Sequence, residues 1–424
     1  MSSSKLKTSD VFSFLNKYFL IILILIIAVC LRTYQLDKSI WLQSGYDESR
    51  DMLVASHIVN YGEHISRGPL VAGGMNWLLN SPIYYYFVSI IWFFTREPTI
   101  FMYVWAAIMT IPVWIGYLIG KRLKDDLTGL ILASLLAANH QMIYSSRELL
   151  QPHLLLIFSL CFIWTGISFL KDKKHKLKYI LLAILFLLSP LHFHYGVFIA
   201  LPIGTIWILK FWYDLNSETE KTSLKKIFAP VIVYFGMVLS WLLVTYRVAV
   251  FDQIYFLLFN FENKYQLSFF SQLRQTFSIL IEMIWGSYYP ISISLLLLIT
   301  AIALISRAIH KEKNKFELSQ FGWVVIFVFS ICSSILLFGF YRHFVTETYM
   351  LFLFPFFITL LAIVLRQTIN AYKIFGYLLT AASILLMIFS NRGYFLNHLP
   401  EVSFKAQQKD IAKKIYDHYN SFYK

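Results

Sequence analysis

Long apolar runs, separated by short clusters of lysine and arginine, fill most of this 424-residue chain. A helix needs about 20 predominantly apolar residues to cross a bilayer, so runs of this length predict membrane-spanning helices. The runs lie near residues 14–32, 99–120, 127–145, 152–170, 178–192, 195–213, 227–247, 287–306, 320–340, 347–365 and 373–390. The pattern therefore predicts an all-α polytopic membrane protein with about eleven transmembrane helices.

One further apolar run, "SPIYYYFVSIIWFF" at residues 81–94, is short, starts at Pro82 and ends against Arg96. If it does not span, every basic loop falls on the same side as the amino terminus, as the positive-inside rule requires of cytoplasmic loops. Those loops are residues 121–126, 171–178, 221–226, 307–315 and 366–373. We therefore expect residues 81–94 to be re-entrant or interfacial, the amino end to be cytoplasmic and the carboxyl end to lie outside the plasma membrane.

Composition agrees with a membrane protein. Hydrophobic residues make up 58% of the chain and charged residues only 14%, and the mean hydropathy is +0.62. The net charge of +14 could suggest nucleic acid, but the cations sit between apolar runs instead of on one patch. The same distribution orients membrane helices, so no nucleic-acid partner is expected.

The chain divides into a transmembrane domain at residues 1–390 and a short external helical tail at residues 391–424. The domain contains the external loop at residues 33–98, and the tail spaces Phe404, Ile411 and Ile415 as a helix would. The aromatic-rich segment 251–289 is expected at the membrane interface, either beside a groove for a lipid ligand or simply as an aromatic belt. Four scattered histidines lack metal-ligand spacing and are expected at solvent or interface positions: His57, His64, His140 and His153.

Several charged residues fall in the loops predicted to lie outside. "DESR" carries Asp47, Glu48 and Arg50 at the start of a helical pattern that ends at Gly62. "SSRELL" carries Arg147 and Glu148 in the next external loop. Polar residues near a membrane are costly unless they face a cavity or a partner, so their gathering on one side indicates a site. An ordinary acidic helix start remains the alternative reading of Asp47 and Glu48.

In order and spacing, these motifs resemble the GT-C membrane glycosyltransferases, especially the branch of protein O-mannosyltransferases and aminoarabinose transferases of lipid A. That branch carries Asp-Glu at the head of an external juxtamembrane helix and a later Arg-Glu pair, similar to "DESR" and "SSRELLQPHLLLIF". "HYGVFIALP" is similar to a third motif, with His194 where many members have Lys, and "YRHFVTETYMLFLFP" is similar to a fourth, with Arg342. The resemblance covers most of the chain and implies a GT-C-like bundle with external juxtamembrane helices.

The resemblance also implies a chemistry. A sugar would pass from a polyprenyl phosphate donor to the hydroxyl of a protein, glycan or lipid acceptor, by inverting displacement on the non-cytoplasmic face. Asp47 would be the general base, and Glu48 and Glu148 would orient the acceptor or the arginines. The donor phosphate would be held by Arg342 first, with His194, Arg147 and Arg50 behind it.

Two questions stay open at this point. Asp47, Glu48 and Glu148 could together hold a divalent metal ion, because hard cations prefer oxygen ligands. The main rival function is a polytopic membrane transporter, which would also have many spans. Transporters often show matching helix breaks in two halves, and no such internal repeat is present here. The gathering of charge at one end of the spans also favours the transferase.

Overall fold

The computed structural model describes residues 8–36, 45–65, 68, 82–172, 175–193, 203–204, 206–207, 268–286, 318–340, 345–398 and 413. Over these residues the regular structure is helical and contains no strand. The helices are α1 (Thr8–Thr33), α3 (Gly45–Tyr61), α4 (Ile83–Thr95), α5 (Pro98–Ile108), α6 (Ile111–Leu123), α7 (Asp126–Ala138), α8 (His140–Arg147), the 3-10 helix η1 (Gln151–His153), α9 (Leu154–Lys171), α10 (Lys176–Phe193), α14 (Phe269–Trp285), α16 (Leu318–Gly339), α17 (Glu347–Met350), α18 (Phe354–Ala371) and α19 (Lys373–His398). The predicted all-α class is confirmed.

Several of these helices meet the length and composition of a membrane span. Within the described residues there are four of them: Pro98–Leu123, Gln151–Phe169, Phe354–Ala371 and Lys373–Arg392. The bent pair α7 and α8 makes a fifth if it is one span. The protein is thus an integral membrane protein. The predicted spans near 195–213, 227–247 and 287–306 lie outside the described residues, apart from 203–204 and 206–207, and the total of about eleven stays a prediction.

The outer faces of the helices are apolar, as a lipid environment requires. On α19, Ile374, Leu378 and Phe389 leave 77%, 64% and 53% of their surface exposed. On α1, Phe19 and Ile26 are 60% and 55% exposed. Such rows would be unfavourable in water but match the acyl chains of a bilayer, where no hydrophobic penalty arises.

Helices α6 and α7 approach each other closely because glycines face their contact. A Cβ at Gly120 would lie 2.5 Å from the carbonyl oxygen of Thr128, and one at Gly129 would lie 2.6 Å from that of Tyr117. Small residues at helix contacts let backbones pack tightly inside a membrane, where dispersion contacts replace the hydrophobic effect. Any larger residue at either glycine would have to push the two helices apart.

The apolar run near 127–145, predicted as one span, is broken. Helices α7 and α8 meet at an angle of 55° around Asn139. Asn139 caps α8, since its Oδ1 accepts a hydrogen bond from the Met142 backbone N–H at 3.0 Å. Its Nδ2 donates to the carbonyl oxygens of Met283 and Ile284 at the end of α14. The predicted span near 127–145 thus consists of two helices joined at a bend, because a side chain that caps a new helix interrupts the ladder of backbone hydrogen bonds.

A break at membrane depth is tolerated only when its backbone groups find other partners. Arg32, at the end of α1, is fully buried and donates to the carbonyl oxygens of Leu136 and Ala137 at 3.1 and 3.4 Å. Asn391 on α19 donates from Nδ2 to the carbonyl oxygen of Ala138 at 2.8 Å. These two side chains donate hydrogen bonds to the backbone carbonyl oxygens in the last turn of α7. The bend therefore leaves none of these three carbonyl oxygens without a donor.

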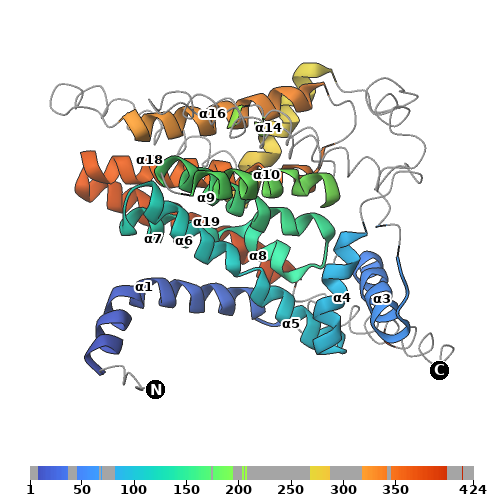
Figure 1. Ribbon diagram of the computed structural model, residues 1–424. Coiled ribbons are helices and arrows are strands. Elements are labelled where there is room, and N and C mark those ends of the chain that lie inside the picture. Colours follow the sequence, from blue (N-terminus) through green and yellow to red (C-terminus); the bar gives the residue numbers. More distant parts are fainter. Residues whose placement is uncertain are drawn as a thin grey trace.

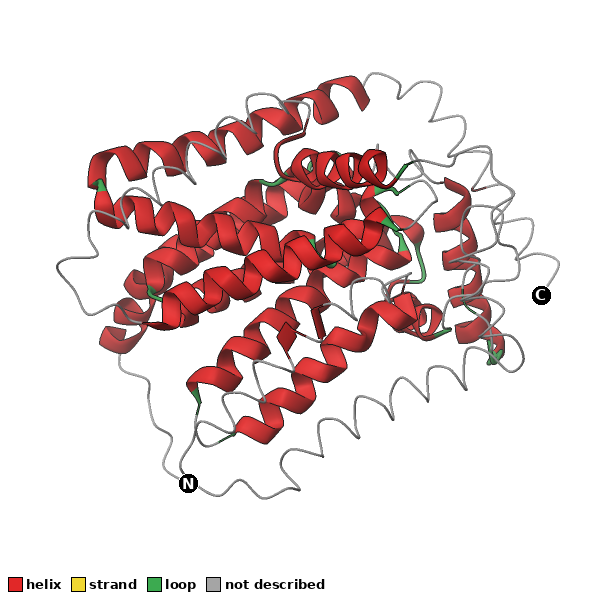
Figure 2. Cartoon of the chain, turned by 90° about the horizontal axis from the view of Figure 1, so that it is seen from above, coloured by secondary structure: helices red, strands yellow, loops and turns green. Residues whose placement is uncertain are grey.

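The two ends of the bundle differ in their charged residues. At one end, Arg366 of α18 pairs with Asp125 at 2.6 Å, and Lys171 of α9 donates to the Leu123 carbonyl oxygen at 3.2 Å. Helix α1 begins at this end, whereas α3 and α4 lie at the other (Figures 1 and 2). Basic helix junctions therefore gather opposite the acidic motifs, as the charge pattern predicts.

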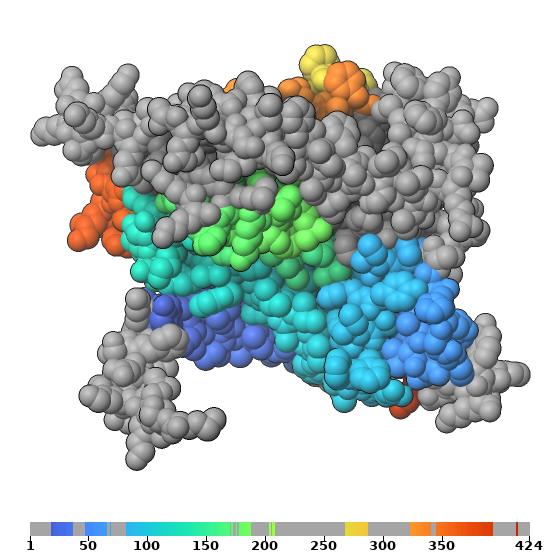
Figure 3. All heavy atoms as spheres, in the orientation of Figure 1, coloured from blue at the N-terminus to red at the C-terminus, as the bar shows by residue number. Residues whose placement is uncertain are grey.

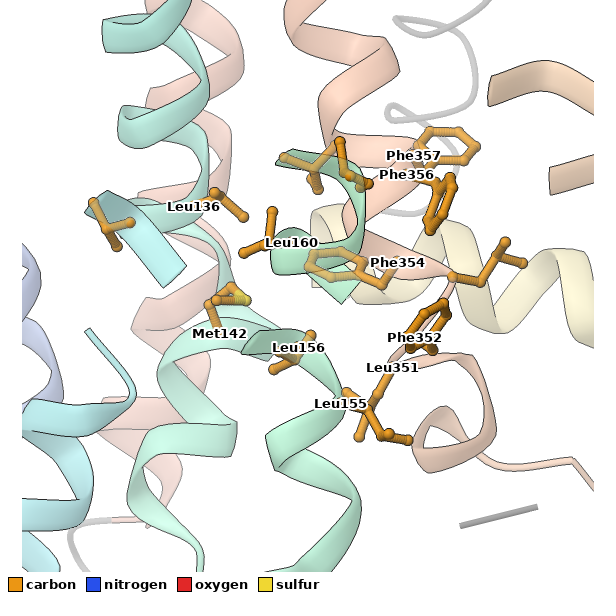
Figure 4. Packing of buried hydrophobic residues seen from close by; sticks show 14 of the residues in the cluster. Leu136, Met142, Leu155, Leu156, Leu160, Leu351, Phe352, Phe354, Phe356 and Phe357 are labelled. Atoms are coloured by element: carbon orange, nitrogen blue, oxygen red, sulfur yellow. The ribbon is translucent and has the colours of Figure 1, made fainter. Parts of the chain in front are cut away.

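An aromatic core lies between α9 and the start of α18 (Figure 4). Phe352, Phe354 and Phe356 are fully buried, and Leu155 and Leu156 face them from α9. The Ser159 hydroxyl also donates to the Phe352 carbonyl oxygen at 2.6 Å. Dense packing of this kind restricts the motion of neighbouring segments. The segment that carries Arg147 and Glu148 directly precedes η1 and α9, so it joins a tightly packed part of the bundle.

Candidate functional site

Helix α3 presents the first acidic motif. It begins at Gly45, has Asp47 and Glu48 in its first turn and ends at Tyr61. Gly62 follows with φ +67°, a left-handed conformation that favours glycine and ends the helix. The predicted helix is confirmed. Its two carboxylates lie where the helix dipole is positive, which stabilises their charge.

Arg50 joins two carboxylates on α3. Its Nη1 donates to Asp47 Oδ1 at 2.5 Å, while its Nε and Nη2 donate to Asp51 Oδ1 at 2.9 and 2.7 Å. The Asp47 side chain is 41% exposed, that of Arg50 is 27% exposed and that of Asp51 is 1% exposed. The three residues thus form a chain of charges that runs from the surface into the interior.

Asp51 is the part of this arrangement that the sequence analysis missed. Burial raises the pKa of its carboxyl to about 6, although Arg50 and the Tyr84 hydroxyl act in the opposite direction. Burial alone would lower the pKa of Arg50, but Asp51 raises it overall. The signal for Asp51 was present in the spacing, because it lies four residues before the buried Ala55 and so on the same helical face.

Helix α4 packs against α3, and the two lie side by side on the surface of the molecule (Figure 3). Tyr84 is fully buried and Tyr85 is 4% exposed. Tyr84 interacts with Asp51, and Tyr85 with Arg50, so tyrosine side chains of α4 adjoin the buried end of these ion pairs. α4 spans only Ile83–Thr95, too short to cross a bilayer by itself, and this length fits the predicted interfacial segment.

Glu48 connects the two acidic motifs. It is 3% exposed, and its Oε1 accepts a hydrogen bond from the Leu149 backbone N–H at 3.0 Å. Leu149 follows directly after Glu148 and is fully buried. The helix that carries "DESR" and the loop that carries "SSRELL" therefore meet through a charge-assisted hydrogen bond.

Arg147, expected as a phosphate ligand, contacts the end of α1 in this structure. Its Nη1 donates to the carbonyl oxygens of Arg32 and Tyr34 at 3.2 and 2.8 Å, and its Nη2 to that of Gln35 at 3.4 Å. With only 4% of its surface exposed, the side chain complements the negative end of a helix dipole. A role toward a donor phosphate stays a prediction.

Glu148 lies against a histidine. His153 Nδ1 is 3.0 Å from the Glu148 carbonyl oxygen, and His153 Nε2 is 3.7 Å from Glu148 Oε2. A carbonyl only accepts hydrogen bonds, so Nδ1 carries a proton, and Nε2 of the neutral ring is then an acceptor that faces a carboxyl group. His153 is fully buried, so its expected place at solvent or an interface is wrong; burial at the packed start of α9 outweighs the polarity of its ring.

The remaining predicted residues lie outside the described part of the chain. They are Arg342 and His194, together with about half of segment 251–289 and the tail beyond His398 apart from residue 413. Of segment 251–289, residues 268–286 are described, including α14. Phe270 of α14 is 79% exposed, while Gln272 and Thr276 are buried. Apolar side chains on the outer face and polar ones on the inner face are typical of a helix that borders lipid.

The three acidic candidates are not placed as a metal centre. Within the described residues, no group of three or more His, Cys, Asp or Glu side chains could hold a metal ion. Glu48 binds a backbone amide, Asp47 binds Arg50, and Glu148 faces His153. These residues, as the structure places them, do not fit a divalent cation.

Comparisons with known proteins find no matching family model and no matching curated protein. Solved structures do match. Oligosaccharyltransferase from Archaeoglobus fulgidus, in complex with zinc and sulfate, is 14% identical with a TM-score of 0.52, covering 88% of this chain and 52% of that one. ArnT from Cupriavidus metallidurans, bound to undecaprenyl phosphate, is 12% identical with a TM-score of 0.55, covering 93% and 76%. The apo form of the archaeal enzyme gives 14% identity and a TM-score of 0.51, covering 95% and 57%.

At these identities the likeness shows a shared fold. The chain spans about half the length of the archaeal oligosaccharyltransferase, so that enzyme has a large part without a counterpart here. The matched portion covers 88–95% of the present chain.

Proposed function

The chain has the GT-C fold of membrane glycosyltransferases, and we propose that it transfers a sugar from a polyprenyl-phosphate-linked donor to an acceptor hydroxyl. The reaction would take place on the non-cytoplasmic face of the plasma membrane, with a protein, a glycan or a lipid as acceptor. ArnT, which shares this fold, holds undecaprenyl phosphate, and that supports a polyprenyl phosphate as the lipid partner.

One observation carries the proposal: an acidic pair at one end of the bundle, with one carboxylate accessible and the other anchored. Asp47 is 41% exposed, whereas Glu48 is buried and bound to Leu149. An accessible carboxylate held on a fixed helix can reach a substrate proton, and an anchored neighbour keeps that helix in place.

The proposed reaction is a single displacement. The acceptor oxygen forms a bond to the anomeric carbon as the bond from that carbon to the phosphate oxygen breaks. Asp47 takes the acceptor's proton, and the polyprenyl phosphate leaves with the bonding electrons. Attack from the face opposite the leaving group inverts the anomeric configuration.

The leaving phosphate gains negative charge and needs cations near it. Arg342 stays the first candidate for this role and His194 the second. Arg50 and Arg147 are weaker candidates than the sequence suggested, because each already binds protein oxygens. Either one would have to give up those contacts to reach a phosphate.

Asp47→Asn tests the proposal. The amide keeps the shape of the side chain but cannot take a proton, so transfer should fall by about 100-fold or more, the usual scale for a lost general base. The assay uses purified protein in lipid vesicles with a pool of polyprenyl phosphate sugars, and it measures both transferred sugar and released polyprenyl phosphate.

Glu63→Gln is the matched control, since Glu63 is an exposed carboxylate just beyond the end of the same helix and should leave the rate unchanged. Transfer by Asp47→Asn at the wild-type rate would move the base to Glu48 or Glu148. Wild-type protein that binds the donors but transfers no sugar would contradict the transferase function itself.

A further inference from the structure

We propose that Asp51 is a positioning residue that acts through Arg50 to orient the Asp47 carboxylate. The inference rests on the proposed function, in which Asp47 is the base. It changes the role of Arg50 from a ligand of the donor phosphate to a bridge between a buried carboxylate and a catalytic one.

The geometry of Arg50 supports this bridge. A guanidinium presents its N–H groups in a rigid planar fork, so fixing one edge fixes the direction of the other. Asp51 Oδ1 accepts from Nε and Nη2 at 2.9 and 2.7 Å, and the remaining Nη1 then points at Asp47 Oδ1 at 2.5 Å. The exposed Asp47 carboxylate is therefore bound by a guanidinium whose orientation is fixed by the buried Asp51 carboxylate.

Asp51 is placed to serve as the fixed end. Its side chain is 1% exposed, and the groups that face it are Arg50 and Asp47 on α3 and the Tyr84 and Tyr85 hydroxyls on α4. Its Oδ2 is buried and has no hydrogen bond of standard geometry among the described residues. Removing a carboxylate from water costs free energy, so a buried carboxylate such as Asp51 is typical of a functional site that uses its charge.

The same contacts explain why Arg50 is a poor phosphate ligand. Its hydrogen bonds to Asp47 and Asp51 engage two carboxylates on its own helix. To bind a phosphate it would have to release Asp51, which would leave a buried carboxylate without its counter-ion, an unfavourable exchange.

Asp51→Asn is the first test. The amide cannot balance the guanidinium charge, so Arg50 loses its fixed orientation and Asp47 is misaligned. We expect kcat for sugar transfer to fall by about 10- to 100-fold, the scale of a small misplacement of a reacting group, with KM for the polyprenyl phosphate donor unchanged. Asp125→Asn is the matched control: it removes a comparable ion pair, with Arg366 at 2.6 Å, and should leave both constants unchanged.

A double-mutant cycle separates positioning from a general loss of structure. If Asp51 acts only through Asp47, the double variant Asp47→Asn with Asp51→Asn is as slow as Asp47→Asn alone. Losses that multiply would overturn the proposal, and so would a raised donor KM in Asp51→Asn with kcat unchanged, because that result would return Arg50 to the phosphate.

A second readout does not depend on activity. Labelling of Asp47 by a water-soluble carbodiimide, read by mass spectrometry, should rise by about two- to fivefold in Asp51→Asn, the scale on which a partly exposed ion pair shields its carboxylate. Unchanged labelling would overturn the bridge, even if the protein proves to transfer no sugar. Should Asp51→Asn fail to fold, the variant Arg50→Gln with Asp51→Asn removes both charges and should show the same increase.

Discussion

At the scale of single residues, Asp51 shows two opposing effects on one carboxyl group. Burial disfavours the charged form, while Arg50 favours it, and the net result is a pKa of about 6. Asp125, at the opposite end of the bundle, shows the reverse balance. Burial would raise its pKa, but hydrogen bonds from Arg366 and Thr128 lower it to about 2. The surroundings of each aspartate therefore shift the pKa of its carboxyl group in opposite directions, although the residue type is the same.

The raised pKa of Asp51 predicts a pH dependence of stability. In the unfolded chain an aspartate has a pKa of about 3.9, so between about pH 4 and pH 6 the folded state binds more protons than the unfolded state. The free energy of unfolding should therefore fall as pH rises through this window, by about 3 kcal/mol at most. Thermal unfolding in detergent, measured for wild type and Asp51→Asn, checks this.

The difference between the two proteins isolates the titration of Asp51, because every other group is shared. Asp51→Asn should gain stability relative to wild type between about pH 4 and pH 6 and stay level above it. A difference that does not change with pH would mean that Asp51 titrates as it does in the unfolded chain.

The sequence was informative about some of these residues for a physical reason. Asp47, Glu48 and Glu148 are charges beside apolar runs, and such charges are conspicuous because lipid excludes them. Asp51 and His153 were missed because they depend on partners from other elements: α4 closes over Asp51, and the packed start of α9 encloses His153. A linear pattern records the type of a residue but not the elements packed against it.

At the scale of helices, the break between α7 and α8 depends on side chains far away in the sequence. Arg32 lies at the end of α1 and donates to the carbonyl oxygens of Leu136 and Ala137. Arg147, at the end of α8, donates in turn to the carbonyl oxygens at the end of α1. Each arginine stabilises the carboxyl end of a neighbouring helix, where a cation is favoured by the dipole.

Arg32→Leu should therefore destabilise the protein strongly. The leucine is apolar and fits a buried site, but it leaves carbonyl oxygens of α7 without their donors, at about 1 to 3 kcal/mol for each buried group. We expect a loss of about 2 to 5 kcal/mol, measured by thermal unfolding in detergent. Arg274→Leu, at an exposed arginine on α14, is the control and should change stability little. Equal effects of the two substitutions would show that the α7 carbonyls find other partners.

The position of helices was more predictable than their breaks. The runs near 152–170 and 178–192 correspond to α9 and α10 with small shifts at their ends, and the run near 373–390 corresponds to α19, which continues to His398. The run near 127–145 is apolar on both sides of Asn139, and hydropathy does not distinguish a continuous helix from a bent one. The capping capacity of Asn139 was the local signal, but its second role, toward the end of α14, could be seen only in the folded chain.

At the scale of the whole molecule, charge and hydropathy together were sufficient for the fold class. A chain this apolar has few alternatives to a helical membrane bundle, and the matched structures share that fold. The convergence of the two acidic motifs was expected from their side of the membrane. The hydrogen bond between Glu48 and Leu149 joins them, although the sequence contained no information about which atoms would meet.

The last prediction concerns the orientation of this bundle. The described basic junctions, near residues 121–126 and 366–373, lie at the end where α1 begins, and the positive-inside rule predicts that this end is cytoplasmic. The acidic site must then lie outside. Two exposed positions mark the ends: Glu63, just after α3, and His175, between α9 and α10. In a background without the native cysteines, Glu63→Cys should react with a membrane-impermeant maleimide in right-side-out vesicles, and His175→Cys only in inverted ones. The reverse result would place the site in the cytoplasm, and reaction of both cysteines from one side would contradict a bundle whose two ends face opposite compartments.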